Sequence, residues 1–257
     1  MLIREAIILA AGLGTRMKSH ITGIPKPLIR VSEVPLILYT IASLLNAGVE
    51  HFHIVVNPKS YEPISKTLGE IDINADFVIN NKPERGNGYS LLLGMKNVKD
   101  RFFLSMSDHI YDPKIPIALL SASVDYDFDI LIGADSNPRY VNMDEATKIF
   151  TKEGHVKQIG KNLTQYTHID IGLFIMKRDL YDVYSSYATH NHEVELSSLI
   201  QYSVEQGKKV LIADIRGLPW IDIDTMEDLH KARTIAKTLI ERATTIVRKY
   251  IGISQIH

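Results

Sequence analysis

Near its start the chain carries a short apolar run that ends in glycines, Glu5-Ala-Ile-Ile-Leu-Ala-Ala-Gly-Leu-Gly-Thr-Arg16. The run has the length of a strand and is almost wholly apolar, which is typical of a parallel strand buried on both faces. The glycines follow directly, so we expect their turn at the carboxyl edge of a sheet. Open α/β folds bind their ligands at that edge.

The turn after this strand has the residue types that hold phosphate oxygens. Gly12 and Gly14 let the backbone approach a phosphate chain closely, and N–H groups exposed in such a turn bind anions. Arg16 adds a fork of donors suited to the same oxygens. Further along, Lys26 stands in the segment Pro25-Lys26-Pro27, where the prolines stiffen the backbone. We therefore expect Lys26 to stabilise charge that develops on a phosphate.

Strand and helix patterns alternate along the first half of the chain. After the first strand, apolar runs predict strands at 51–57, 75–79, 101–106 and 129–134. Apolar residues at helical spacing predict helices at 35–46 and 88–98. This alternation predicts an α/β fold, with a Rossmann-like mixed, mostly parallel sheet and helices on both faces.

The second half is more mixed. Short strands at 146–151, 155–159 and 168–176 are expected to form an antiparallel flap. Two helices and a strand should follow at 178–187, 193–206 and 209–214.

The last part of the sequence predicts one long amphipathic helix. Asp224 and Glu227 are placed like an N-cap and its N3 acid, and an apolar stripe follows opposite a basic face. We divide the chain into a main domain at 1–228 and a basic helical extension at 229–257. Packing on the same domain, a homodimer contact and the approach to a further domain all fit this helix.

The composition excludes several classes of protein. The net charge of −1 gives no general electrostatic reason to bind nucleic acid. The absence of cysteine excludes disulfides and thiolate chemistry, and it fits a cytoplasmic protein. The sequence has no secretory signal pattern and no apolar run of the roughly 18 residues that a membrane span needs.

Three features stand together: Leu9-Ala-Ala-Gly-Leu-Gly-Thr-Arg16, Pro25-Lys26-Pro27 and the apolar helix that follows them. In this combination the chain resembles the sugar-phosphate nucleotidyltransferase family over nearly its whole length. The resemblance implies a nucleotidyltransferase domain in which Arg16 and Lys26 are catalytic. It also implies that the first motif binds the nucleotide, through Leu9, Ala10, Ala11, Gly12, Gly14 and Thr15.

Carboxylates at two strand ends suggest a Mg²⁺ site. Asp108 ends a strand and should face the same crevice as the glycine turn, and Mg²⁺ usually binds one or two carboxylates together with phosphates. Asp222 and Asp224 are two residues apart, so both point the same way in an extended segment. Since Asp224 is also the expected cap, we favour Asp222 as the second metal ligand. Asp222 also matches the family's second metal aspartate. Asp224 is the alternative ligand.

Further substrate contacts follow from the resemblance. Gly86 and Asn87 open a helix where the family places a small turn against the base, although a plain Gly-Asn turn is an equal alternative. Lys161 stands where relatives hold the acceptor phosphate with a lysine. Asp170 stands where sugar-handling relatives bind hydroxyls. His109 either contacts substrate or fills a wall of the site.

Four stretches depart together from hexose-1-phosphate enzymes, at 106–109, 144–148, 159–163 and 169–174. As a set they are similar to the CTP:inositol-1-phosphate cytidylyltransferases of heat-loving microbes. This resemblance implies transfer of CMP from CTP to inositol 1-phosphate, giving CDP-inositol for di-myo-inositol phosphate. In many such proteins a membrane alcohol phosphotransferase domain follows.

Two alternatives stay open. One is another enzyme of this fold that uses a hexose 1-phosphate or phosphocholine, and a choline site would need an aromatic cage, for which Tyr140, Tyr166 and Trp220 are available. The other is a non-catalytic regulatory subunit, although such proteins usually lose the arginine, the lysine or the carboxylates that are present here.

Overall fold

The computed structural model describes residues 3–14 and 23–252, and within them nine strands form one sheet. Their order is β5-β4-β1-β6-β11-β8-β12-β10-β9. Two small sheets accompany it, one of β2 (Arg30–Val31) with β3 (Val34–Pro35) and one of β7 (His109–Tyr111) with β13 (Trp220–Asp222). The predicted α/β class with a mixed sheet is confirmed.

One half of the large sheet is parallel. It consists of β5 (Ala75–Ile79), β4 (His51–Val56), β1 (Glu5–Ala10) and β6 (Arg101–Met106). All four strands were predicted from their apolar runs. Because they are parallel, their carboxyl ends lie at one edge of the sheet, and the glycine turn after β1 lies there too.

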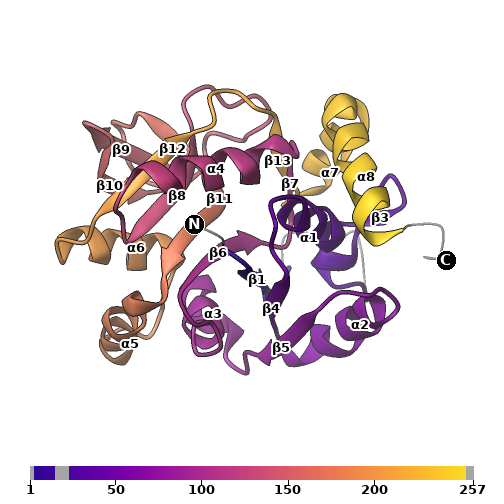
Figure 1. Cartoon of the computed structure of the whole chain (residues 1–257), viewed down its shortest axis with the longest axis horizontal. Helices are drawn as coiled ribbons and strands as arrows, with labels where there is room; N and C mark the ends of the chain where they lie inside the picture. Colours follow the sequence, from indigo (N-terminus) through magenta and orange to yellow (C-terminus); the bar gives the residue numbers. More distant parts are fainter. Residues whose placement is uncertain (1–2, 15–22, 253–257) are drawn as a thin grey trace.

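The other half is mixed. β11 (His168–Lys177) runs antiparallel to β6 and to β8 (Ile130–Asp135), while β12 (Val210–Asp214) runs parallel to β8. β9 (Lys148–Lys152) and β10 (His155–Gly160) form an antiparallel pair at the far end, where the flap was expected (Figure 1).

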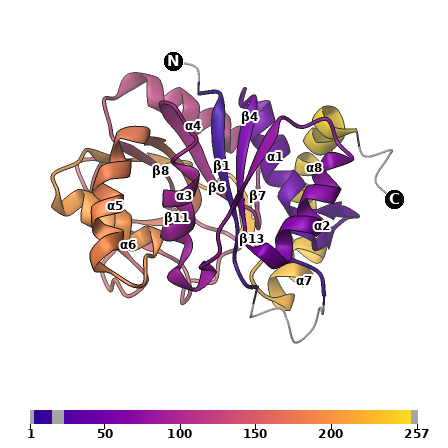
Figure 2. The ribbon, with the colours of Figure 1, turned by 90° about the horizontal axis from the view of Figure 1, so that it is seen from below.

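Helices cover both faces of the sheet (Figures 1 and 2). Neighbouring residues of one strand point to opposite faces, so Ile8 belongs to one apolar core and Ile7 to the other. The first core is completed by α1 (Leu36–Asn46), α2 (Pro58–Gly69), α4 (Lys114–Asp125), α7 (Met226–Thr234) and α8 (Lys237–Ile251). The second is completed by α3 (Asn87–Gly94), α5 (Tyr181–His190) and α6 (Leu196–Glu205).

Two helices, α2 and α4, were not predicted; α2 contains Pro58 and Pro63, and α4 contains Pro116. Pro58 is at the start of α2, where a missing N–H costs nothing, but Pro63 is inside the helix. Asn57 compensates by capping α2 with its side chain, which accepts hydrogen bonds from the backbone N–H groups of Lys59 and Ser60.

The predicted long C-terminal helix is in fact two helices, and its N-cap is one residue later than expected. Thr225 Oγ1 accepts a hydrogen bond from Asp228 N at 3.2 Å, and the Asp228 carboxylate accepts one from Thr225 N at 2.8 Å. This reciprocal pair is a capping box, so the assignment of Asp224 as cap with Glu227 at N3 is wrong. The carboxylate of Asp224 is turned toward Lys26 instead.

α8 packs along α1 (Figure 1). It shares the core of α1, with Leu239, Ala243 and Val247 buried. Arg242 of α8 also donates a hydrogen bond to the buried carboxylate of Asp112, at 3.0 Å. The expected division at residue 228, and a role of α8 in a homodimer, stay predictions. Across the described ranges, no helix combines the length and apolar composition needed to cross a membrane.

Candidate active site

Three segments meet at the carboxyl edge of the parallel strands. The loop after β1, the turn after β6 that contains Asp108, and the segment after β13 that contains Asp224 converge there. Lys26 begins a short 3-10 turn (Lys26–Leu28) beside them. Together these segments line a cavity of about 310 Å³.

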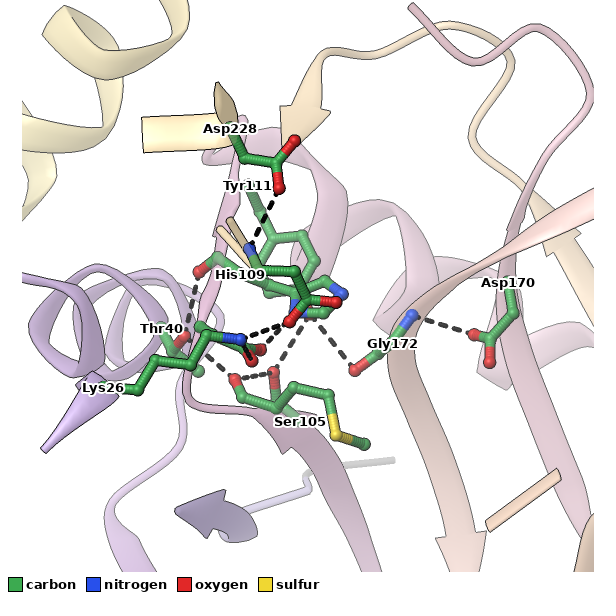
Figure 3. A network of polar contacts seen from close by, with 11 residues as sticks. Lys26, Thr40, Ser105, His109, Tyr111, Asp170, Gly172 and Asp228 are labelled. Atoms are coloured by element: carbon green, nitrogen blue, oxygen red, sulfur yellow. Dashed lines mark hydrogen bonds and ion pairs between the residues drawn. The ribbon is translucent and has the colours of Figure 1, made fainter. Parts of the chain in front are cut away.

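Lys26 lies between two carboxylates in this cavity (Figure 3). Its ammonium donates hydrogen bonds to Asp108 Oδ2 and to Asp224 Oδ1. Burial acts to lower the pKa of Lys26, but the two carboxylates outweigh it and the pKa is raised. Burial likewise acts to raise the pKa of Asp108, but Lys26 and His109 hold that pKa well below its usual range. Lys26 and Asp108 therefore carry their charges at neutral pH.

The predicted nucleotide-binding residues that the structure describes all line this cavity: Leu9, Ala10, Ala11, Gly12, Gly14, Gly86 and Asn87. Within the part of the chain that the structure describes, a Cβ at Gly12 would meet nothing within 4 Å, so no described residue fills the space above this backbone. Gly14 has a φ of +60°, a left-handed conformation that favours glycine. Thr15 and Arg16, predicted for the same site, lie outside the described residues.

Gly86 and Asn87 connect the cavity to the start of α6. Gly86 has a φ of +96°, and a Cβ there would lie 2.7 Å from the carbonyl oxygen of Val194. Asn87 Oδ1 accepts a hydrogen bond from Leu196 N at 2.8 Å, so a base in the cavity would meet the Nδ2 donor instead. Both residues thus have a structural role, and their contact with a base stays a prediction.

A second cavity, of about 240 Å³, adjoins the first. The structure brings the predicted acceptor residues His109, Lys161 and Asp170 together in its lining. Asp222 also lines this second cavity, and the lining of the first does not include it. The residues common to both linings are Asn87, Met106, Asp108 and Asp224. The two cavities therefore meet at the carboxylates that hold Lys26.

His109 supports Asp108 from the side of the second cavity. Its Nδ1 is 2.8 Å from Asp108 Oδ1, and its ring lies parallel to that of Trp220 with centroids 5.9 Å apart. Gly172 leaves room for the ring, because a Cβ there would lie 2.7 Å from His109 Nε2. Burial acts to lower the pKa of His109, but the hydrogen bond to Asp108 and the charges of Asp108, Asp222 and Asp224 together outweigh it, and the pKa is raised. Direct contact of His109 with a substrate stays a prediction.

Asp170 holds a carboxyl group that titrates near neutral pH. Burial raises the pKa of Asp170 to about 7, although a hydrogen bond from Gly172 N at 2.8 Å and the charge of His109 act to lower it. The folded protein thus keeps a proton on Asp170 that the unfolded chain, with an ordinary carboxyl pKa, has lost. The cost of burying the charged form is absent below about pH 4 and complete above pH 7.

We expect the Asp170→Asn variant to lose less stability than the parent protein between pH 5 and pH 8. The loss in the free energy of unfolding should differ by about 1–2 kcal/mol between the two proteins, because one pKa unit corresponds to about 1.36 kcal/mol and solvent partly screens the carboxyl. Urea unfolding of both proteins at the two pH values measures it. The exposed Asp72→Asn variant is the control and should follow the parent protein. Equal pH dependence in the parent protein and Asp170→Asn would contradict the assignment.

Sequence reasoning missed three residues that shape the site. Asn57 Nδ2 donates to the carbonyl oxygen of Ala11 at 3.0 Å and so ties the glycine loop to α2. Thr40 of α1 donates to the carbonyl oxygen of His109 at 3.0 Å and fixes the turn that bears Asp108 (Figure 3). Glu195 lines the second cavity. Asn57 follows β4 directly, and this position at the carboxyl edge of the sheet could have identified it as a site residue from the sequence.

A glycine loop after the first strand, a lysine held by two carboxylates and an adjoining polar cavity define a nucleotidyltransferase. Residues 6–216 match the MobA-like NTP transferase domain, and the chain belongs to this family. It is thus an enzyme that uses a nucleoside triphosphate.

Relatives of known description support the same class of enzyme. The chain is 30% identical to the inositol-1-phosphate CTP transferase from T. maritima, with a TM-score of 0.87 over 95% of this chain and 97% of that one. It is 34% identical to a bifunctional IPC transferase and DIPP synthase of Aquifex aeolicus, over 93% of this chain and 54% of the relative. A protein of the same description from Archaeoglobus fulgidus is 35% identical, over 90% and 43%. The chain spans about half the length of the curated relatives it matches.

Proposed function

We propose that this protein transfers CMP from CTP to inositol 1-phosphate, giving CDP-inositol and pyrophosphate. The observation that carries the proposal is the meeting of two cavities at Asp108 and Asp224. One cavity has the glycine loop and suits a triphosphate, and the other has a lysine among carboxylates and suits a phosphorylated polyol. The descriptions of the relatives from T. maritima and A. aeolicus support the same choice of substrates.

The residues at this junction fit Mg²⁺. Asp108 and Asp224 already converge on one cation, the ammonium of Lys26, and carboxylate oxygens are ligands that Mg²⁺ prefers. We propose that these two aspartates hold the ion, with Asp222 as the remaining candidate. When bound, the ion supplies electrostatic stabilisation of the phosphate oxygens. Asp224 is favoured because Thr225 and Asp228 form the cap that had been assigned to it.

The residues of the chain account for the chemistry as follows. The N–H groups of the loop at Gly12 and Gly14 bind the phosphates of the nucleotide, with Arg16 proposed beside them. Lys26 offers its positive charge to the α-phosphate as negative charge builds there. Lys161 holds the acceptor phosphate so that its oxygen attacks the α-phosphorus in line. A phosphate monoester is mostly ionised near pH 7, so positioning suffices and no general base is required.

The second cavity favours a polyol over choline. Its carboxyl groups can accept hydrogen bonds from several hydroxyls, and they come from Glu145, Asp170, Glu195 and Asp222. A quaternary ammonium would need converging aromatic faces. Trp220 lines the cavity with its ring stacked on His109, but among the described lining residues Tyr140 and Tyr166 are absent. A hexose 1-phosphate is also a polyol, so experiment must separate it from inositol 1-phosphate.

The test is pyrophosphate release with Mg²⁺ at elevated temperature, across four nucleoside triphosphates and a panel of phosphorylated acceptors. We expect turnover with CTP and inositol 1-phosphate alone. Preferred turnover with a hexose 1-phosphate or phosphocholine would keep the enzyme class and overturn the substrate. A folded protein that is silent across the panel would contradict the proposal and favour a non-catalytic subunit.

Three expectations from the sequence lie beyond the site and stay predictions. These are a cytoplasmic location, a homodimer, and a membrane alcohol phosphotransferase acting on the product.

A further inference from the structure

A cluster of two histidines and two carboxylates lies at the amino ends of the parallel strands, at the opposite edge from the active site. Its members are Glu5 of β1, His51 and His53 of β4, and Asp76 of β5. The lining of the active-site cavity begins at Leu9 of β1, four residues along the same strand. At about 3.3 Å per residue, the two places are about 13 Å apart. The nucleotidyltransferase chemistry makes no use of this cluster.

The strand register itself brings these four residues together. Glu5 is paired with His51 across β1 and β4, and His53 is paired with Asp76 across β4 and β5. His51 and His53 are two residues apart, so their side chains leave the same face of the sheet. All four side chains therefore lie on one face, on adjacent strands. This arrangement follows from the backbone pairing and does not depend on one choice of rotamers.

The potential ligand atoms are close to one another. One nitrogen or oxygen from each of Glu5, His51 and His53 lies within 4.8 Å of the others. His53 Nε2 is 3.4 Å from Glu5 Oε1, and His51 Nε2 is 3.0 Å from Asp76 Oδ2. The two imidazole rings are 4.5 Å apart between centroids. Small side-chain rotations would bring three such atoms to the separations found around a single ion.

His53 is buried with an unsatisfied nitrogen. Its side chain is 2% exposed, and its Nδ1 has no hydrogen-bond partner among the residues that the structure describes. A buried polar atom without a partner costs free energy. A ligand or an ion bound to this nitrogen would remove that cost. Asp76 Oδ2 lies 3.9 Å from this nitrogen.

Glu5 is already held in place for a ligand role. Its Oε2 accepts a hydrogen bond from the backbone N–H of Lys99 at 3.1 Å, which leaves Oε1 facing His53. Carboxylate ligands in metal sites are commonly fixed in this way by a second hydrogen bond. Lys99 follows α3 in the chain, so the helix that covers this face of the sheet also orients the carboxylate.

We propose that Glu5, His51 and His53 form a second metal site, for a first-row transition-metal ion such as Zn²⁺, with Asp76 at its rim. Imidazole ligands favour zinc, cobalt and nickel over magnesium, whereas the oxygen ligands of the active site favour magnesium. The protein therefore offers two chemically distinct metal sites at opposite edges of one sheet.

The test is titration of the untagged full chain with Co²⁺ in millimolar Mg²⁺, followed by visible absorption and isothermal titration calorimetry. Mg²⁺ in excess occupies sites made of oxygen ligands alone. We expect a Co²⁺ ion to bind with the absorption of nitrogen ligation and to be displaced by Zn²⁺. Absence of such binding by the folded protein would overturn the proposal.

Variants assign the ligands. His51→Ala changes a partly exposed residue, and Glu5→Gln keeps the shape and an acceptor while removing the charge. Each should weaken Co²⁺ affinity by about tenfold or more, since even changes around metal ligands commonly cost 10–100-fold. His155→Ala, an exposed strand histidine elsewhere in the sheet, is the matched control and should bind as the parent protein does. Unchanged affinity in both His51→Ala and Glu5→Gln would contradict the assignment.

Discussion

The Lys26→Met variant is expected to lower kcat by about 10²–10³-fold, the usual cost of removing one preorganised charge from a transition state. Methionine keeps most of the side-chain length and removes the charge. Lys26 is held by Asp108 and Asp224 at the junction of the two cavities, so its position is fixed before the substrate arrives. Steady-state pyrophosphate release measures the loss, and CTP affinity measured by calorimetry should change far less.

The same variant should also become less stable in the absence of metal. Without Lys26, the carboxylates of Asp108 and Asp224 face each other in a nearly buried place, and like charges repel. Added Mg²⁺ should therefore raise the Tm of Lys26→Met more than that of the parent protein. Lys66→Ala, an exposed lysine on α2, is the control and should change neither quantity. Retained turnover in Lys26→Met would contradict the catalytic role of Lys26.

The parts of the site that the sequence predicted are those whose position depends on a strand end. Gly12 follows β1 and Asp108 follows β6, and both strands were recognisable as short apolar runs. Parallel pairing then places both residues at the same edge of the sheet without any further information. The same logic predicts that a histidine and a carboxylate at the other strand ends should meet at the opposite edge, as His51 and Glu5 do.

The parts that it missed depend on contacts between distant elements. Thr40 reaches the turn after β6 because α1 packs against that part of the chain, and no local sequence pattern marks this threonine as a contact of the site. Helix α2 was not predicted because it contains Pro63, whose missing N–H would normally interrupt a helix. The cap of α7 was misplaced by one residue, since both Asp224 and Thr225 are good N-cap residues and only the partner at Asp228 decides between them.

That single-residue shift matters most for the metal site, because it removes one of the two reasons for preferring Asp222, the expected use of Asp224 as the cap. Asp224 reaches Lys26 and lines both cavities, whereas Asp222 is paired with His109 across β7 and β13 and lines the acceptor cavity. The contact of Asp224 with Lys26 and its place in both cavity linings therefore favour Asp224 as the second ligand.

We therefore expect Asp224→Asn to reduce kcat by about 100-fold or more, because a metal ion's charge stabilisation is worth several kcal/mol. The Mg²⁺ concentration needed for half-maximal turnover should rise as well. Asp222→Asn is the matched control, two residues away and equally conservative, and should mainly raise the KM for the acceptor. A Mg²⁺ titration of activity in both variants separates the two roles. If Asp222→Asn alone shifts the Mg²⁺ dependence, Asp222 is the ligand, and Asp224 serves to position Lys26.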